Sequence, residues 1–97
     1  MSSIEAIAVS GMRFASARLA AHGSNTANLL SEGYQAKTVS GVTMDGGGVR
    51  AIVGESAQVN LEDEIIGAQL TAFMYAANAA VIYAADAAAG SLLNRKA

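Results

Sequence analysis

The stretch NLEDEIIGAQLTAFMYAANAAVIYAADAAAGSLLNRK, residues 60–96, is the longest part of the chain with one continuous helical pattern. It is rich in alanine, which favours helix at little entropic cost, and it contains no proline. Asn60 is a natural N-cap, and the acids that follow it stand in the first turn, where the helix dipole favours negative charge. Arg95 and Lys96 stand near the other end, where cations are favoured. The stretch therefore predicts a long helix over about residues 60–94.

This helix is apolar on every side, because residues 65–85 carry no charge. The length is sufficient to span a bilayer. Against spanning, the segment is built on alanine, and it contains Gln69, Thr71 and Asn78, with Asp86 just beyond. Leu, Ile, Phe and Val, which drive insertion, are sparse. Burial among other protein helices is therefore favoured, and a membrane-spanning helix stays as the alternative.

The first part of the chain predicts a second helix, over about residues 3–30, with Ser2 or Ser3 as its cap. Apolar or small residues recur there at a three-four spacing, which predicts one face that packs on a partner helix. These residues are Ile4, Ile7, Ala8, Gly11, Met12, Ala15 and Leu19. Gly11 costs roughly 1 kcal/mol in mid-helix against alanine, which indicates a close approach of two helices. Arg13 and Ser16 are expected to face away.

The middle of the chain, residues 31–58, predicts a turn followed by a small β-hairpin. Gly33 can adopt positive φ, so that the chain reverses before Tyr34. Apolar residues then alternate on either side of the glycine-rich turn at residues 45–48. The expected fold is a mainly α single domain over residues 1–97, with two long terminal helices paired as an α-helical hairpin or coiled coil. A lone hairpin is marginal in water, so we expect it to lie on the helices or on another subunit.

One short helix cannot cover every side of a longer one, so part of the second helix is expected to lack a partner. The seam toward the first helix is expected to contain Ile65, Ala68, Ala72, Tyr75, Ala79, Ile82, Ala89 and Leu93. A second stripe then remains: Ile66, Leu70, Phe73, Ala77, Ala80, Ala84 and Leu92. An apolar stripe of that size marks an interface or an aggregation hazard. We therefore expect the isolated chain to be partly disordered.

Composition weighs against catalysis and against several kinds of ligand. The chain has no cysteine and one histidine, and its net charge of −2 gives no positive field for nucleic acid. The glycines at residues 46–48 lack the GK[ST] of a phosphate loop. We interpret His22 as a residue at a helix end, and we expect the acids at residues 62–64 to be solvated in the first turn of a helix. Tyr75 and Asn78, one turn apart, are expected to make a polar contact between helices. We expect no enzymatic activity, cofactor, metal site or small-molecule substrate.

Both ends of the chain resemble bacterial flagellar axial proteins, the rod and hook family. At the N-terminal end, three elements match the family's SGL, NxAN and TxGY signature: Ser10-Gly11-Met12, Asn25-Thr26-Ala27-Asn28 and Ser31-Glu32-Gly33-Tyr34. At the C-terminal end, the elements similar to the family's last helix are Val59-Asn60, Glu64, Tyr75-x-Ala77-Asn78, Asp86 and Leu92-Leu93-Asn94. The two blocks cover about two thirds of the chain. The short middle looks most like a proximal rod protein, although it is shorter than in ordinary members.

The resemblance implies a structural function. Rod and hook subunits pair their terminal helices in a core domain, and many copies form the helical tube that transmits torque for motility. They leave the cell through the flagellar type III export apparatus without a cleaved signal, which agrees with the absence of a basic, apolar leader in residues 1–10. The implied partners are further copies and other axial proteins, and the implied location is the rod of the basal body in the periplasm. The implied assembly residues are Gly11, Asn25, Ala27, Asn28, Gly33, Tyr34, Tyr75, Asn78, Asp86, Leu92 and Leu93.

Asn25 and Asn28 are expected to fix backbone geometry and to contact neighbouring subunits. We hypothesise that the substitution Asn28→Ala disrupts assembly more than helicity. A simple intramolecular cap is the alternative role for these amides, because such side chains often bond locally. At the level of the whole protein, the alternatives to a rod subunit are a small membrane-spanning protein and a helical adaptor related to flagellar export that does not polymerise.

Overall fold

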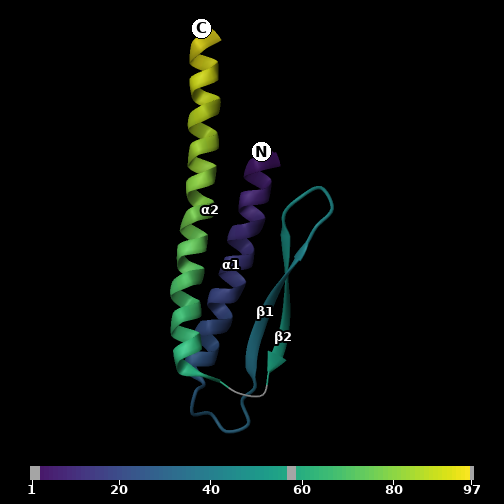
Figure 1. Ribbon diagram of the computed structural model, residues 1–97, viewed down its shortest axis with the longest axis vertical. Helices are drawn as coiled ribbons and strands as arrows, with labels where there is room; N and C mark the ends of the chain where they lie inside the picture. The colour runs from purple at the N-terminus through teal and green to yellow at the C-terminus, as the bar shows by residue number, and fades with distance from the viewer. Residues whose placement is uncertain (1–2, 57–58, 97) are drawn as a thin grey trace.

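The computed structural model describes residues 3–56 and 59–96, with side chains through residue 93. Helix α1 (Ser3–Ala27) is followed by strands β1 (Ala36–Thr43) and β2 (Val49–Ser56) and by helix α2 (Leu61–Lys96) (Figure 1). The predicted mainly α class, with two helices and a small β-hairpin between them, is confirmed. Ser2 and the side chains of Arg95 and Lys96, which entered the expected helix ends, lie outside the described part.

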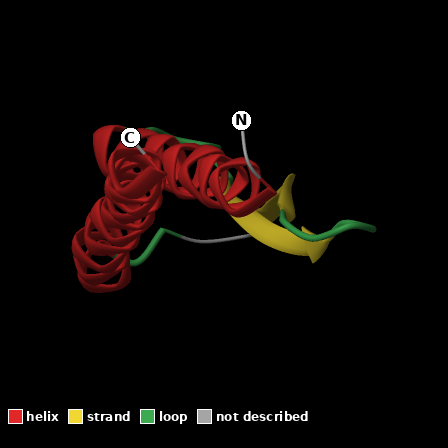
Figure 2. Ribbon diagram, turned by 90° about the horizontal axis from the view of Figure 1, so that it is seen from above, coloured by secondary structure: helices red, strands yellow, loops and turns green. Residues whose placement is uncertain are grey.

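The elements form three layers, with α1 between α2 and the β-hairpin (Figures 1 and 2). The molecule measures 64 × 25 × 13 Å, and its radius of gyration is 17.2 Å. A compact domain of about 100 residues has a radius of gyration near 13 Å. The chain is therefore a thin, elongated body with little interior.

Helix α1 is shorter than expected, because it ends at Ala27 rather than near residue 30. The Asn28 backbone N–H still bonds to Ser24 O at 3.0 Å, but Leu29 N and Ser31 N bond to carbonyls only three residues back. The Asn28 side chain also donates to Ser24 O, at 2.9 Å. Local capping therefore ends the helix before the turn begins.

Helix α2 begins at Leu61 and has Asn60 as its N-cap, as expected: the Asn60 side-chain oxygen accepts a bond from Asp63 N at 3.2 Å. Asn60 O also accepts the first helical bond, from Glu64 N at 3.0 Å. The helix continues to Lys96, two residues beyond the expected end at about residue 94.

The helices lie antiparallel, and two glycines fix their register. A Cβ added to Gly11 would lie 2.7 Å from Asn78 Oδ1, and one added to Gly67 would lie 2.5 Å from His22 Cε1. The close approach predicted at Gly11 is confirmed. His22 lies eleven positions after Gly11, and Asn78 lies eleven positions after Gly67, so the same antiparallel register places Ser3 level with Asp86. The last turns of α2 therefore extend past the start of α1 (Figure 1).

The expected seam between the helices is wrong at several positions. Ile65 and Tyr75 are 47% and 41% exposed, and Ala72 is exposed as well. Ala68, Ala79 and Ile82 of the expected seam are half-buried, but the buried positions of α2 are Glu64 and Thr71, and Asn78, seven residues further on, is half-buried. The register follows these polar side chains because Glu64 has hydrogen-bond partners on α1. Ala89 and Leu93 are exposed because they lie beyond the end of α1.

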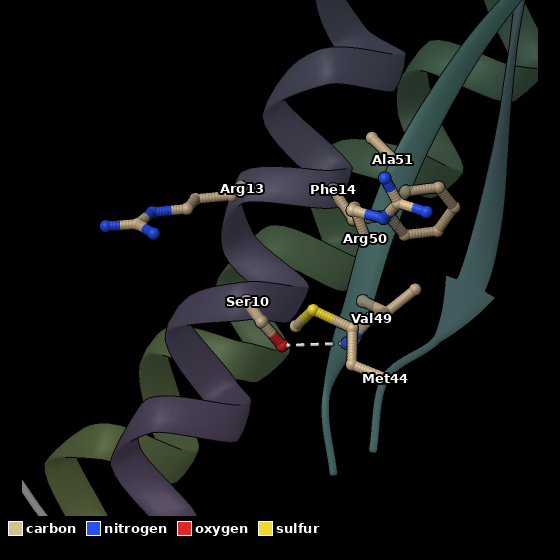
Figure 3. A pocket seen from close by; sticks show the side chains of 7 residues that line it. All are labelled: Ser10, Arg13, Phe14, Met44, Val49, Arg50 and Ala51. Atoms are coloured by element: carbon tan, nitrogen blue, oxygen red, sulfur yellow. Dashed lines mark hydrogen bonds between the residues drawn. The ribbon is translucent and has the colours of Figure 1, made fainter. Parts of the chain in front are cut away.

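The β-hairpin pairs Ala36 with Ser56 through to Thr43 with Val49, so it is longer than the alternation alone indicated. Its turn closes with a bond from Met44 N to Gly48 O, at 3.0 Å, and all three turn glycines have positive φ. The hairpin lies on α1, as expected of a two-stranded sheet that is marginal alone. Val49 N donates to Ser10 Oγ at 3.1 Å, which ties β2 to the helix (Figure 3).

The interior of the described chain is small and partly polar. Its buried apolar residues are all alanines: Ala8, Ala15, Ala21 and Ala36. The largest fully buried side chains are Asn25 and Thr71. The large apolar residues expected on the inner face of α1 are exposed, including Ile4 at 58% and Ile7 at 44%. Because alanine buries little area, the free energy from burial within one copy is small.

Candidate functional site

Asn25, in the last turn of α1, is the centre of a hydrogen-bond network that joins α1, β1 and α2. It is 1% exposed. Its amide nitrogen donates to Lys37 O and to Glu64 Oε1, both at 2.9 Å. Its amide oxygen accepts bonds from Lys37 N at 2.7 Å and from the Tyr34 hydroxyl at 2.9 Å. All the hydrogen-bonding capacity of this amide is used, as a buried polar group requires.

The two bonds between Asn25 and the Lys37 backbone cover the edge of β1. They take both the N–H and the C=O of Lys37, so the side chain acts as a short replacement for a further strand. An open strand edge is a template for unwanted pairing. Only an amide supplies a donor and an acceptor side by side at this length, which explains why the position holds asparagine.

Glu64 joins the network from the first turn of α2. Its Oε1 accepts from Asn25, and its Oε2 lies 2.6 Å from Nδ1 of His22. The carboxylate is an acceptor, so Nδ1 carries the proton in this contact. The side chains of His22 and Glu64 are 18% and 11% exposed. The expectation that residues 62–64 are all solvated is wrong for Glu64, because α1 covers it.

The turn after α1 completes the network. The Tyr34 hydroxyl bonds to Asn25 and also lies 2.9 Å from Ser24 Oγ. Gly33, with φ of 76°, directs the chain back so that Tyr34 reaches α1. Asn28 is half-buried, and its Oδ1 accepts a bond from Ser31 Oγ at 3.1 Å. Asn25, Gly33 and Tyr34 therefore act inside one copy, and the expected subunit contacts of Asn25 and Asn28 stay predictions.

The remaining expected assembly residues lie outside this network. Asn78 faces Gly11 and donates to Met74 O at 3.0 Å, so the expected contact with Tyr75 is absent among its described bonds. Tyr75, Ala27 and Asp86 are exposed, and Leu92 and Leu93 are 60% and 70% exposed on the overhanging end of α2.

The network includes two side chains, His22 and Glu64, that sequence reasoning did not bring together. His22 and Asn25 are three residues apart and therefore share a face of α1. An acid at the start of an antiparallel helix is the natural partner for such a face. The sequence contained both features, but to pair them one must know the register of the two helices, and no sequence pattern specified that register.

The arrangement around His22 holds a histidine in place but presents no reactive nitrogen to a ligand. The nitrogen Nε2 is buried against Gly67, and it has no hydrogen-bond partner among the described residues. Ser24, the nearest hydroxyl in sequence, is bonded to Tyr34. Within the described residues, no cluster of three or more His, Asp or Glu side chains has the geometry of a metal site. The hydrogen bonds of this network hold α1, β1 and α2 together.

A groove of about 280 Å³ lies between α1 and the hairpin. Ser10, Arg13, Phe14, Met44, Val49, Arg50 and Ala51 line it (Figure 3). Phe14 also carries the Arg18 guanidinium 5.6 Å from its ring centroid, within the range of a cation–π contact. The groove thus combines an apolar floor with exposed arginines.

The outer α2 face, defined as Glu62, Asp63, Ile66, Leu70 and Phe73, is uncovered. Its apolar members are 63%, 54% and 72% exposed, in that order. The apolar stripe predicted to remain free is confirmed as exposed over its whole length. Residues 61–93 of α2 are long and apolar enough to cross a membrane: the most apolar window of this helix has a mean hydropathy of 1.5, and 6% of that window is buried.

Comparison with known proteins finds no family model that matches the chain and no matching curated protein.

Proposed function

We propose that this chain is a structural subunit of the bacterial flagellar rod and that it assembles with further copies and other axial proteins. It performs no catalysis and needs no cofactor. In this proposal α1 and α2 form a coiled coil of the rod core-domain type, and export proceeds through the flagellar type III apparatus. The rod then transmits torque in the periplasmic part of the basal body.

One observation carries the assembly part of the proposal: the described chain buries alanines while it exposes its large apolar side chains. Phe73, Tyr83 and Leu93 are 72%, 79% and 70% exposed. Large exposed apolar side chains of this kind indicate an interaction surface. Small chains with thin cores also depend on partner chains, metals or disulfides, and this chain has no cysteine.

The flagellar part of the proposal rests on the sequence resemblance at both ends of the chain. The positions of the motifs are compatible with it. The NxAN element at residues 25–28 and the Ser31-Glu32-Gly33-Tyr34 element, where serine replaces the family's usual threonine, meet at the bond between Asn25 and Tyr34, and Glu64 of the C-terminal block bonds to Asn25. The motifs thus meet in one hydrogen-bond network, which joins the end of α1 to the start of α2.

The test is deletion of the gene, followed by electron tomography of the cell envelope. We expect basal bodies that keep an inner-membrane ring but lack a complete rod, together with loss of motility. A plasmid copy of the gene should restore both. Intact, motile flagella in the deletion strain would contradict the rod assignment.

A membrane-spanning protein is the second candidate, and the exposed, apolar α2 is the observation that favours it. The two candidates differ in cell fractionation. A rod subunit made without its basal body is recovered from the soluble fraction in the absence of detergent. A spanning protein stays with the membranes after a carbonate wash. Recovery as a stable monomer or dimer at high concentration would instead favour the export-related adaptor.

A further inference from the structure

We infer that copies of this chain join head to tail, with the groove between α1 and the hairpin of one copy receiving the acidic start of the outer α2 face of the next. This inference rests on the proposed function, because it names the contact by which subunits assemble.

The receiving surface is basic and apolar. Phe14, Met44 and Val49 form its apolar lining, while Arg13 and Arg50 are exposed at its margin. Figure 3 shows that Arg13 extends from α1 away from the strands. Neither arginine has an ion-pair partner among the described residues. Both charges are thus available to a ligand that brings an apolar group and carboxylates together.

The start of the outer α2 face has that combination. Glu62 and Asp63 are exposed and have no ion-pair partner in the described part of the chain. Ile66 lies four residues after Glu62 and three residues after Asp63, so the three side chains share one side of the helix. Ile66 is 63% exposed. One apolar side chain with two nearby carboxylates therefore complements an apolar groove that has Arg50 at its margin and Arg13 on the adjoining side of α1.

The positions of the two surfaces explain why the partner is a second copy. The hairpin lies on one side of α1 and α2 lies on the other (Figure 2), so α1 stands between the hairpin and α2 within one copy. One copy cannot satisfy its own groove. A contact between two different surfaces of identical chains is heterologous, and repetition of it gives a ring or an open row of subunits. Leu70 and Phe73 continue the outer α2 face and lengthen the contact.

The test is charge reversal on each surface of the full chain, with association measured by sedimentation velocity over a concentration series at low salt. We expect R13E/R50E alone and E62R/D63R alone to raise the concentration needed for association by about tenfold or more, because like charges then face each other. An equimolar mixture of the two variants should regain association, since the native groove of one meets the native acidic face of the other. The fourfold variant, with both surfaces reversed, should also associate.

The matched control is E32R/E55R, which changes the net charge by the same amount as E62R/D63R but at exposed acids outside both surfaces. It should associate like the wild type, and circular dichroism should show equal helix content in every variant. If the wild type associates and the reversals have no effect, or if the mixture does not recover, this inference is overturned while the proposed function stands. If the wild type stays monomeric throughout the series, self-assembly itself fails.

Discussion

At the scale of residues, the protein depends on one buried amide. Asn25 bonds to a helix, a strand and a tyrosine in the following turn, and it does so with no polar atom left over. Buried networks of this kind stabilise a single arrangement when every member is satisfied, and they are costly when one member is lost. Because so few apolar side chains are buried, we expect the hydrogen bonds of the Asn25 network to supply a large part of the free energy that favours this helix pairing over others.

The substitution Asn25→Asp tests this dependence. It removes both Nδ2 donors and places a carboxylate beside Glu64, so we expect the free energy of unfolding to fall by about 3 kcal/mol or more. Urea denaturation at one fixed protein concentration measures the change. The neighbouring Thr26→Ala is the control: its exposed hydroxyl returns only to His22 O, and its effect should stay within about 0.5 kcal/mol. Equal stability of the two variants would contradict the central role of Asn25.

Asn28 allows assembly to be separated from folding. The described bonds of its side chain, to Ser24 O and from Ser31 Oγ, lie within the last turn of α1 and the start of the loop. We expect Asn28→Ala to keep nearly all the helical circular dichroism signal but to impair association measured by sedimentation. Full loss of helix in this variant would refute the hypothesis, and unchanged association would leave Asn28 the role of an intramolecular cap.

At the scale of elements, the two helices approach each other where one of them has glycine. His22 lies over Gly67 and Asn78 lies over Gly11, so each helix supplies a polar side chain to a glycine of the other. The approach brings Glu64 within hydrogen-bond distance of His22 and Asn25. The helices can approach closely enough for these hydrogen bonds because the two glycines have no Cβ atom.

Gly67→Ala and Gly90→Ala form a matched pair on the same helix. The first puts a methyl group 2.5 Å from the His22 ring, which Glu64 holds in place, so we expect a loss of about 1–3 kcal/mol. The second meets no atom within 4 Å and should stabilise α2 by roughly 0.5–1 kcal/mol through helix propensity. Thermal unfolding followed at 222 nm compares them. A gain in stability for both variants would show that the helices do not approach closely at Gly67.

At the scale of the whole molecule, the chain has the form of a component rather than a self-sufficient domain. It is a narrow body 64 Å long, its interior is alanine and polar, and its longest helix is covered on only one side. In the proposed assembly, other copies cover the exposed apolar surface and stabilise the folded chain by mass action.

The melting temperature should therefore depend on protein concentration. We expect a broad transition in dilute solution and a higher, sharper one as the concentration rises, because association stabilises only the folded form. Differential scanning calorimetry over a hundredfold concentration range tests this. A sharp transition at one temperature throughout the range would mean that the monomer is stable alone and would contradict the picture of a component.

The sequence by itself determined the elements of this protein. The helical pattern and the Asn60 cap define α2, the glycine cluster defines the β-hairpin turn, and the mid-helix Gly11 indicates the close helix approach. These are local signals, because capping, turn chemistry and periodicity act over a few residues. The tertiary structure decided what local signals cannot specify, namely the register of the helices. That register buries Glu64 and Thr71 instead of Ala72, leaves Ile65 and Tyr75 exposed, and brings His22, Asn25 and Glu64 together from distant parts of the chain. In a seam of small residues many registers bury similar apolar area, so the hydrogen bonds of the Asn25 network select one of them.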